Sequence, residues 1–254
     1  MNSCQGDHGR SPQPDDGLSS DKLQSISNRI LLSLPANTLS SLLPHLDSIE
    51  LERGAVVKKV EEPIDHNYFV ESGLISVIKT MRNGQVVEVG AIGNEGMTDP
   101  LSAFGIDRAT LDTIVQISGS AYRIRSDILQ QAAREDICLK DRLENYLRFS
   151  IRQLTQTSAC NGLHSLDRRC CRWLLIADDC TQSNDIHLTH EFLAMMLGVL
   201  RPSVSLALGG LKRDGLIDHA HGSIKVKNRK ALEKRSCECY QDVQTELNEL
   251  FDHS

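Results

Sequence analysis

Residues 189–226 read THEFLAMMLGVLRPSVSLALGGLKRDGLIDHAHGSIKV, and this stretch decides the fold of the C-terminal part of the chain. Thr189 is a residue type that caps the start of helices, and Gly198 ends the apolar run after it because glycine adopts positive φ freely. Pro202 then suits the first turn of a second helix. The stretch therefore predicts two short helices joined by Gly198 and a three-residue turn, a helix-turn-helix.

The two predicted helices carry apolar residues where they cross. In the second helix, Val204, Leu208 and Leu211 recur at helical spacing and form the predicted buried face. Ala194 in the first helix offers the small side chain that a close crossing of two helices needs. By spacing alone, the pair is equally consistent with a purely structural corner of two helices.

The residues after the second helix favour one of these alternatives. Asp214 and Gly215 end the helix, and residues 216–226 hold two short apolar segments around His221-Gly222, which predicts a two-stranded wing. Residues 201–230 carry seven basic and two acidic side chains, although the whole chain has a net charge of −6. A solvated basic face would explain the lysines but not the helix pair and wing beside them, so the combination predicts a DNA-binding winged helix-turn-helix. The seven cations are Arg201, Lys212, Arg213, Lys225, Lys227, Arg229 and Lys230.

The predicted recognition helix has side chains suited to base edges and to phosphates. Arginine and small polar residues at the first turn reach base edges, as Arg201, Ser203 and Ser205 would, while cations further along the helix and on the wing contact phosphates. The candidate DNA-binding residues are Thr189, His190, Arg201, Pro202, Ser203, Ser205, Leu206, Lys212, Arg213, His221 and Lys225.

Residues 49–125 have a different residue pattern, in which short runs rich in β-branched residues are separated by glycine. Turn signals lie at residues 71–73 (Glu-Ser-Gly) and at residues 82–84 (Arg-Asn-Gly), and the Asn83-Gly84 pair is a strong hairpin signal. Many short strands over such a length predict a small antiparallel barrel or jelly roll. The fold class predicted for the whole chain is α+β.

A long helix is expected after the β region. Apolar residues recur every three to four positions over residues 139–158, and a helix of that length exceeds what closing a small barrel requires. We expect this stripe to pair with a second copy of the chain in a homodimer, with packing inside the same chain as the alternative. The stripe consists of Leu139, Leu143, Leu147, Ile151 and Leu154.

The expected domain organisation follows from these changes in residue pattern along the chain. We expect a flexible tail at 1–27, a sensory β-roll at 28–138, a dimerisation helix at 139–158, a winged helix-turn-helix at 159–232 and a helical extension at 233–254. The first residues lack the apolar core of a secretory signal, and the nine-residue apolar stretch at 192–200 is too short to cross a bilayer. A cytoplasmic location without membrane association is expected.

Two segments carry a family resemblance. LTHEFLAMMLGVLRPSVSLALGGLKRDGLIDHAHGSIKVKN at 188–228 resembles the DNA-binding end of the Crp/Fnr superfamily of bacterial transcription regulators, and LERGAVVKKVEEPIDHNYFVESGLISVIKT at 51–80 is similar to its cyclic-nucleotide-binding-type β-roll. The resemblance covers roughly residues 28–235. It implies a sensory β-roll, a dimer helix and a winged helix-turn-helix that binds a two-fold symmetric operator, with RNA polymerase as a further partner.

The recognition helix departs from the family pattern R-E-x-V-x-R. Arg201 is retained, but Pro202 replaces the glutamate and Leu206 replaces the second arginine. Neither proline nor leucine hydrogen-bonds a base edge, although Leu206 is able to contact a thymine methyl group. We therefore expect a changed operator preference that depends less on G·C contacts.

The effector region also departs from the family. Members that bind cyclic nucleotides use a glutamate for the ribose hydroxyl and an arginine followed by serine or threonine for the phosphate. Glu95, Arg108 and Thr110 are the possible counterparts, but the turn is altered and Thr110 does not directly follow the arginine. A role in shaping the roll is favoured over binding of a cyclic nucleotide.

The cysteines do not follow a known metal-site spacing. The close pairs among the eight cysteines are Cys170-Cys171 and Cys237-x-Cys239, and neither comes with a second pair at zinc spacing. Cys4 alone precedes Cys138, which disfavours an iron–sulfur cluster of the family type, and His66 is a weak candidate for a haem ligand. No metal or cofactor is predicted.

No catalytic motif stands out in the sequence, so the chain is not expected to be an enzyme. The alternative to a DNA-binding regulator is a ligand-gated regulatory or interaction protein that uses the same β-roll without binding an operator.

Overall fold

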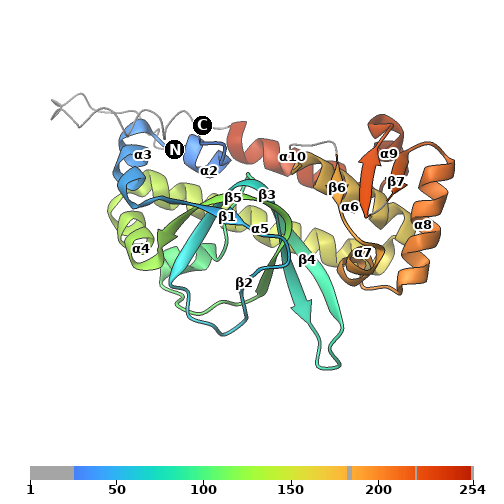
Figure 1. The fold of residues 1–254 in the computed structure, drawn as a ribbon. Helices are drawn as coiled ribbons and strands as arrows, with labels where there is room; N and C mark the ends of the chain where they lie inside the picture. The colour runs from blue at the N-terminus through green and yellow to red at the C-terminus, as the bar shows by residue number, and fades with distance from the viewer. Residues whose placement is uncertain (1–25, 182–184, 221, 253–254) are drawn as a thin grey trace.

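The computed structural model describes residues 26–181, 185–220 and 222–252. Almost all of the predicted tail, and His221, lie outside the described residues. Figure 1 shows a β-roll crossed by the long helix α5 (Ile137–Leu163), with a second, smaller domain at the far end of that helix. The predicted α+β architecture, an antiparallel roll followed by a winged helix-turn-helix, is confirmed.

The β-roll is a five-stranded antiparallel sheet. Its strands run in the order β1-β5-β3-β4, with β2 paired to β5. The predicted hairpin at Asn83-Gly84 is confirmed, since Gly84 has a φ of +81° and the loop joins β3 to β4. The strands are β1 (Asp47–Leu51), β2 (Val56–Lys58), β3 (His66–Thr80), β4 (Val86–Ile92) and β5 (Asp112–Arg125).

The predicted turn at residues 71–73 is wrong, because β3 continues through it as a single strand of 15 residues. The pairing of β3 with β5 shifts register around Ser72, and Gly73 has a φ of +84°. A Cβ atom at Gly73 would lie 2.5 Å from the carbonyl oxygen of Ile117, and one at Gly119 would lie 2.0 Å from that of Ser72. The glycines therefore permit close, bulged pairing of β3 with β5, and β5 also continues through Gly119 as one strand.

Helices close one side of the roll. The side chain of Asp136 caps α5 by accepting hydrogen bonds from the backbone N–H groups of Cys138 and Leu139. Phe69, Tyr146 and Phe149 are buried in the core between the sheet and these helices. The other helices here are α2 (Arg29–Leu32), α3 (Ala36–Leu42) and α4 (Ser126–Glu135), with short 3₁₀ turns η1 (Leu43–His45) and η2 (Pro100–Phe104).

The C-terminal domain is built around Trp173 of α6 (Leu166–Asp179). Ser165 stands at the N-cap position of α6 but makes no side-chain capping bond. The wing pairs β7 (Ile217–Ala220) with β8 (Ser223–Val226), and β6 (Ile186–His187) adds a third strand that the sequence did not indicate. The remaining helices are α7 (His190–Leu197), α8 (Arg201–Arg213), α9 (Arg229–Arg235) and α10 (Cys239–Asp252).

Helix α10 returns from the C-terminal domain along α5 to the N-terminal helices (Figure 1). Val243 and Leu247 join the same buried core as Ile30, and the guanidinium of Arg29 lies 4.2 Å from the ring centroid of Phe251. These contacts make α10 a strap between the two domains.

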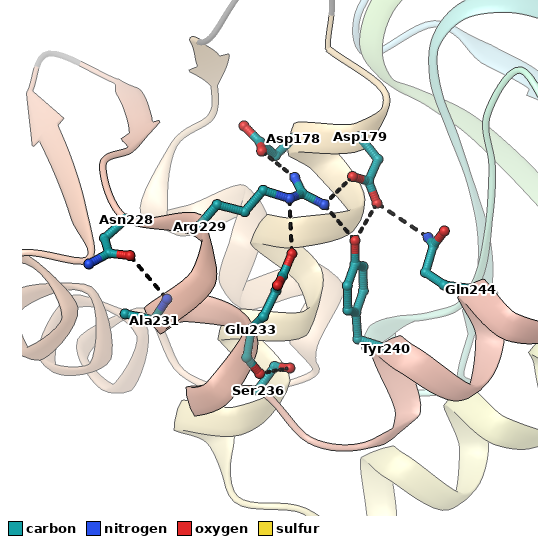
Figure 2. Close-up of polar contacts among 9 residues, drawn as sticks. All are labelled: Asp178, Asp179, Asn228, Arg229, Ala231, Glu233, Ser236, Tyr240 and Gln244. Carbon is teal, nitrogen blue, oxygen red and sulfur yellow. Dashed lines mark hydrogen bonds and ion pairs between the residues drawn. The ribbon is translucent and has the colours of Figure 1, made fainter.

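Arg229 fixes the start of that strap. Figure 2 shows its guanidinium between Asp178 and Asp179 at the end of α6, with the Tyr240 hydroxyl of α10 within 2.6 Å. Tyr240 in turn donates to Asp179 over 2.9 Å. The network joins α6, α9 and α10 where the wing domain meets the strap.

No single helix within the described ranges is long and apolar enough to cross a membrane, and the bent pair α7–α8 passes only when the two are counted together.

Candidate DNA-binding surface

Helices α7 and α8 form the predicted helix-turn-helix. The Thr189 hydroxyl accepts a hydrogen bond from the backbone N–H of Phe192 and caps α7. Gly198 has a φ of +64° and reverses the chain after α7, so that the two helix axes meet at 107°. This angle lies within the range of DNA-binding helix-turn-helix units.

The apolar crossing of the two helices is also as predicted. Val204, Leu208 and Leu211 are each 0% exposed, and Ala194 faces them from α7 at 2% exposed. Burial of the three large side chains stabilises the pair by about 1.5–3 kcal/mol each relative to exposure. The crossing therefore holds α8 rigidly and leaves its other face to solvent.

The outer face of α8 carries the predicted base-contacting residues. Arg201 is the first residue of the helix and Pro202 follows it in the first turn, both exposed. Ser203 and Ser205 are partly exposed on the same helix. Leu206 is 77% exposed, a large apolar side chain that the fold does not use. Leu200 is also 77% exposed in the turn, and sequence reasoning did not single it out.

A groove separates the start of α8 from the wing. It has a volume of about 380 Å³ and is lined on its two sides by Arg201 and by Ser223. His190 lies at its edge, where its Nδ1 is 2.9 Å from the Ser205 hydroxyl and its ring meets that of His219 edge-on at 5.3 Å. Burial, and then the neighbouring charges of His219 and Arg201, lower the pKa of His190, which favours its neutral form.

Several cations counted from the sequence are paired inside the chain. Lys212 lies 2.8 Å from Asp218, and Lys225 lies 3.0 Å from Asp185. Both lysines remain about half exposed, so phosphates are able to compete for them. Arg229 does not belong to the DNA-facing set, because its guanidinium is held in the network of Figure 2. Arg213 is exposed and has no ion pair within the described residues.

Two protein-family models match the chain. The Crp-like helix-turn-helix domain matches residues 168–235, and the cyclic nucleotide-binding domain matches residues 48–136. Together the two ranges span more than half of the 254 residues. The chain belongs to the Crp/Fnr family. Members of this family are DNA-binding transcription regulators, and this chain has both of their characteristic domains in the expected order.

Solved structures of Crp/Fnr regulators share the fold of this chain. FixK2 from Bradyrhizobium japonicum is 17% identical in sequence and aligns with a TM-score of 0.62. The alignment covers 76% of this chain and 98% of the FixK2 chain. A regulator of the family from Eubacterium rectale is 15% identical with a TM-score of 0.63, covering 81% and 96%. The c-di-GMP responsive global regulator CLP from Xanthomonas campestris is 19% identical with a TM-score of 0.57, covering 76% and 99%. No curated protein matches the chain.

The predicted effector residues of this Crp/Fnr regulator do not converge on one site. Arg108 is exposed and donates to the backbone carbonyl of Glu61 over 2.7 Å. Glu95 lines a cavity of about 160 Å³ between α5, α6 and α10, and accepts from the backbone N–H of Gly93. Thr110 lines a different cavity of about 110 Å³ between the roll and α5. Glu95 and Thr110 therefore line different cavities, and Arg108 lines neither of these two.

The stripe predicted for dimerisation packs largely within the regulator's own chain. Leu139 and Leu143 are 0% exposed in the core between α5, the N-terminal helices and α4, so they are not available to a second copy. Leu147 and Leu154 are partly buried, and Leu154 packs against the β-roll core. Ile151 alone of the five is exposed, at 54%. The apolar face of α5 packs against the β-roll of the same chain. The spacing of apolar residues is the same for such a face as for a dimer interface, so it does not distinguish the two.

Proposed function

We propose that this regulator acts as a homodimer that binds a two-fold symmetric DNA operator, with α8 of each copy in a major groove. The observation that carries the proposal is the exposed N-terminal part of α8, where Arg201 begins the helix and the exposed Leu206 follows five residues later. Arg201 contacts base edges with its guanidinium, and Arg213 and Lys225 bind phosphates on either side. The remaining proposed contacts are Thr189, His190, Pro202, Ser203, Ser205, Lys212 and His221.

The operator preference follows from the same face. Arginine favours guanine, whereas Leu206 and Pro202 offer only apolar contact. These side chains favour a half-site with one guanine, contacted by Arg201, and one thymine, whose methyl group contacts Leu206.

The dimer contact lies on the exposed face of α5, centred on Ile151. Arg148 and Thr155 are exposed one turn to each side of it. A contact through these three exposed residues does not require the buried residues of α5 to move. In the proposed dimer, the two recognition helices lie about 34 Å apart on one side of the duplex. A signal received by the β-roll changes that spacing through α5, and RNA polymerase is the partner that completes transcriptional control in the cytoplasm.

Fluorescence anisotropy on a short duplex carrying a selected binding site tests the proposal. Arg201→Ala is expected to weaken binding at least tenfold, because the dimer loses two base contacts that are each worth about 1–3 kcal/mol. Arg82→Ala, which removes an exposed arginine from the β3–β4 loop, is the matched control and keeps the affinity.

A chain that binds no duplex at low salt contradicts the proposal and supports the alternative, an interaction protein that uses the β-roll without an operator. Equal affinity of Arg201→Ala and Arg82→Ala contradicts the assignment of Arg201.

A further inference from the structure

Four potential metal ligands meet where α5 ends and α10 begins. They are Cys160, His164, Cys237 and Cys239, and their ligand atoms all lie within 4.8 Å of one another. The three cysteines are buried, at 0%, 2% and 1% exposed, and form a separate small core of their own. The DNA-binding surface does not use any of them.

Two separate segments supply these ligands. Cys160 lies in the last turn of α5, and His164, four residues later, is the C-cap residue that directly follows the helix. Cys237 and Cys239 flank Glu238 in the turn between α9 and α10, and Cys239 is the first residue of α10. The packing of α10 against α5 brings the two pairs together.

We propose that Cys160, His164, Cys237 and Cys239 bind one structural Zn²⁺ ion in a tetrahedral site. With Zn–S bonds of about 2.3 Å and Zn–N bonds of about 2.0–2.1 Å, a tetrahedron separates two sulfurs by about 3.8 Å and a sulfur from a nitrogen by about 3.6 Å. The Sγ atoms of Cys160 and Cys237 are 3.5 Å apart, and Sγ of Cys239 is 3.5 Å from Nδ1 of His164. Three cysteines and one histidine form a closed donor set, as in structural rather than catalytic zinc sites.

Groups around the ligands orient them for a metal. Nδ1 of His164 faces Cys239, while its Nε2 lies 3.1 Å from the Glu238 carboxylate. A zinc-bound histidine characteristically donates its second ring N–H to a carboxylate in this way. The Gln156 amide also donates to Sγ of Cys239 over 3.0 Å, as expected around a metal-bound thiolate.

Buried positive charge beside the cluster favours negatively charged cysteine thiolates. Arg169 and Arg172 are only 7% and 5% exposed, and the Nε atom of each has no hydrogen-bond partner within the described residues. Both guanidinium groups interact electrostatically with Cys237. Zn²⁺ with three thiolates and a neutral imidazole carries one net negative charge, which compensates part of this buried positive charge.

Other uses of the cysteines fit the geometry less well. An iron–sulfur cluster places iron and sulfide ions between its cysteines and so needs ligand atoms farther apart than these. A disulfide between Cys160 and Cys237 needs a sulfur separation of about 2.05 Å, and it would leave His164 and Cys239 without a role. Bound zinc instead uses all four groups and pins the strap helix α10 to α5.

Metal content and cobalt substitution test the site on the full-length protein, purified under reducing conditions. We expect inductively coupled plasma mass spectrometry to find about one zinc ion per chain. After removal of the metal with a chelator, added Co²⁺ is expected to give the absorption of a tetrahedral thiolate site, and Zn²⁺ to displace it.

Variants separate this site from the other cysteines. Cys237→Ser and His164→Gln are expected to lose the cobalt spectrum or weaken Co²⁺ binding at least tenfold. Cys138→Ser, at the opposite end of α5, is the matched control and keeps one metal per chain. Should a ligand variant fail to fold, competition between the unmodified protein and a chromophoric chelator gives the zinc affinity directly.

Substoichiometric zinc with no tetrahedral cobalt spectrum in the reduced protein overturns the proposal. So does a Cys160–Cys237 disulfide found by peptide mapping of protein kept reduced throughout. Neither outcome bears on DNA binding, which is measured separately.

Discussion

Asp99 is a partly buried carboxylate whose removal is expected to stabilise the protein at neutral pH. It lines the cavity between the roll and α5, and its Oδ2 atom has no hydrogen-bond partner within the described residues. Burial raises the pKa of Asp99 from 3.8 to about 6, although the charge of Lys58 acts in the opposite direction. Its φ of +49° is a conformation that asparagine also tolerates, so Asp99→Asn removes the charge without new backbone strain.

The size and sign of the effect follow from the raised pKa. The folded state holds the proton more tightly than the unfolded chain, so stability is fully present below pH 3.8 and is lost as the pH rises through about 6. The loss amounts to about 3 kcal/mol at pH 7.5 and to roughly half of that at pH 5. These are the largest gains that Asp99→Asn is able to give at each pH, because the attraction to Lys58 is lost as well.

Urea unfolding at pH 5 and pH 7.5 measures this difference. Asp99→Asn is expected to raise the free energy of unfolding at pH 7.5 and to raise it clearly less at pH 5. Asp107→Asn, an exposed aspartate in the following loop, is the control and shows neither effect. A gain that is equal at both pH values, or a loss at pH 7.5, refutes the reasoning.

Three further predictions concern the strap, the dimer and the DNA contacts. Arg229→Met leaves two aspartates of α6 without their cation and is expected to lower the free energy of unfolding by about 1–2 kcal/mol, since the side chain is 37% exposed. Urea unfolding checks this, and a loss no larger than that of exposed Lys230→Ala speaks against the network. Ile151→Glu is expected to shift the chain from dimer to monomer in sedimentation equilibrium, whereas Ile137→Glu, at the exposed start of α5, leaves the dimer intact; an unchanged mass for both places the interface elsewhere. Arg213→Ala is expected to reduce the slope of log affinity against log salt by about 1 per copy, and an unchanged slope removes this arginine from the phosphate contacts.

The winged helix-turn-helix was predictable because its signals are local. Thr189, Gly198 and Pro202 each act on the backbone within a few residues of themselves, and the structure places all three as expected. Strand continuity through Gly73 was not predictable, because it depends on the close approach of β5, which is distant in the sequence.

Charge and periodicity predicted less than local signals did. Arg229 is one of the seven cations of residues 201–230, yet two aspartates about 50 residues away in the sequence bind its guanidinium. Leu139 showed the spacing of a dimer seam, but the same spacing buries it against its own β-roll. Which partner an apolar face meets is a tertiary property that spacing alone does not encode.

The cysteine–histidine cluster was missed for a similar reason. Zinc sites are found in sequences by two close pairs, and here one pair consists of a cysteine and a histidine, Cys160 and His164, at the C-terminal end of α5. The other pair follows more than 70 residues later and joins the first only because α10 folds back along α5. A cysteine and histidine four residues apart, together with C-x-C, is the combination that could have indicated it.

Selection of bound duplexes from random-sequence DNA tests the central claim most directly. The account predicts an inverted repeat with half-site centres about 34 Å, one helical turn, apart, in which Arg201→Ala relaxes the preference at one position of each half-site. Selected sequences without two-fold symmetry, or the same preferences from the Arg201→Ala protein, would contradict the placement of α8 in the major groove.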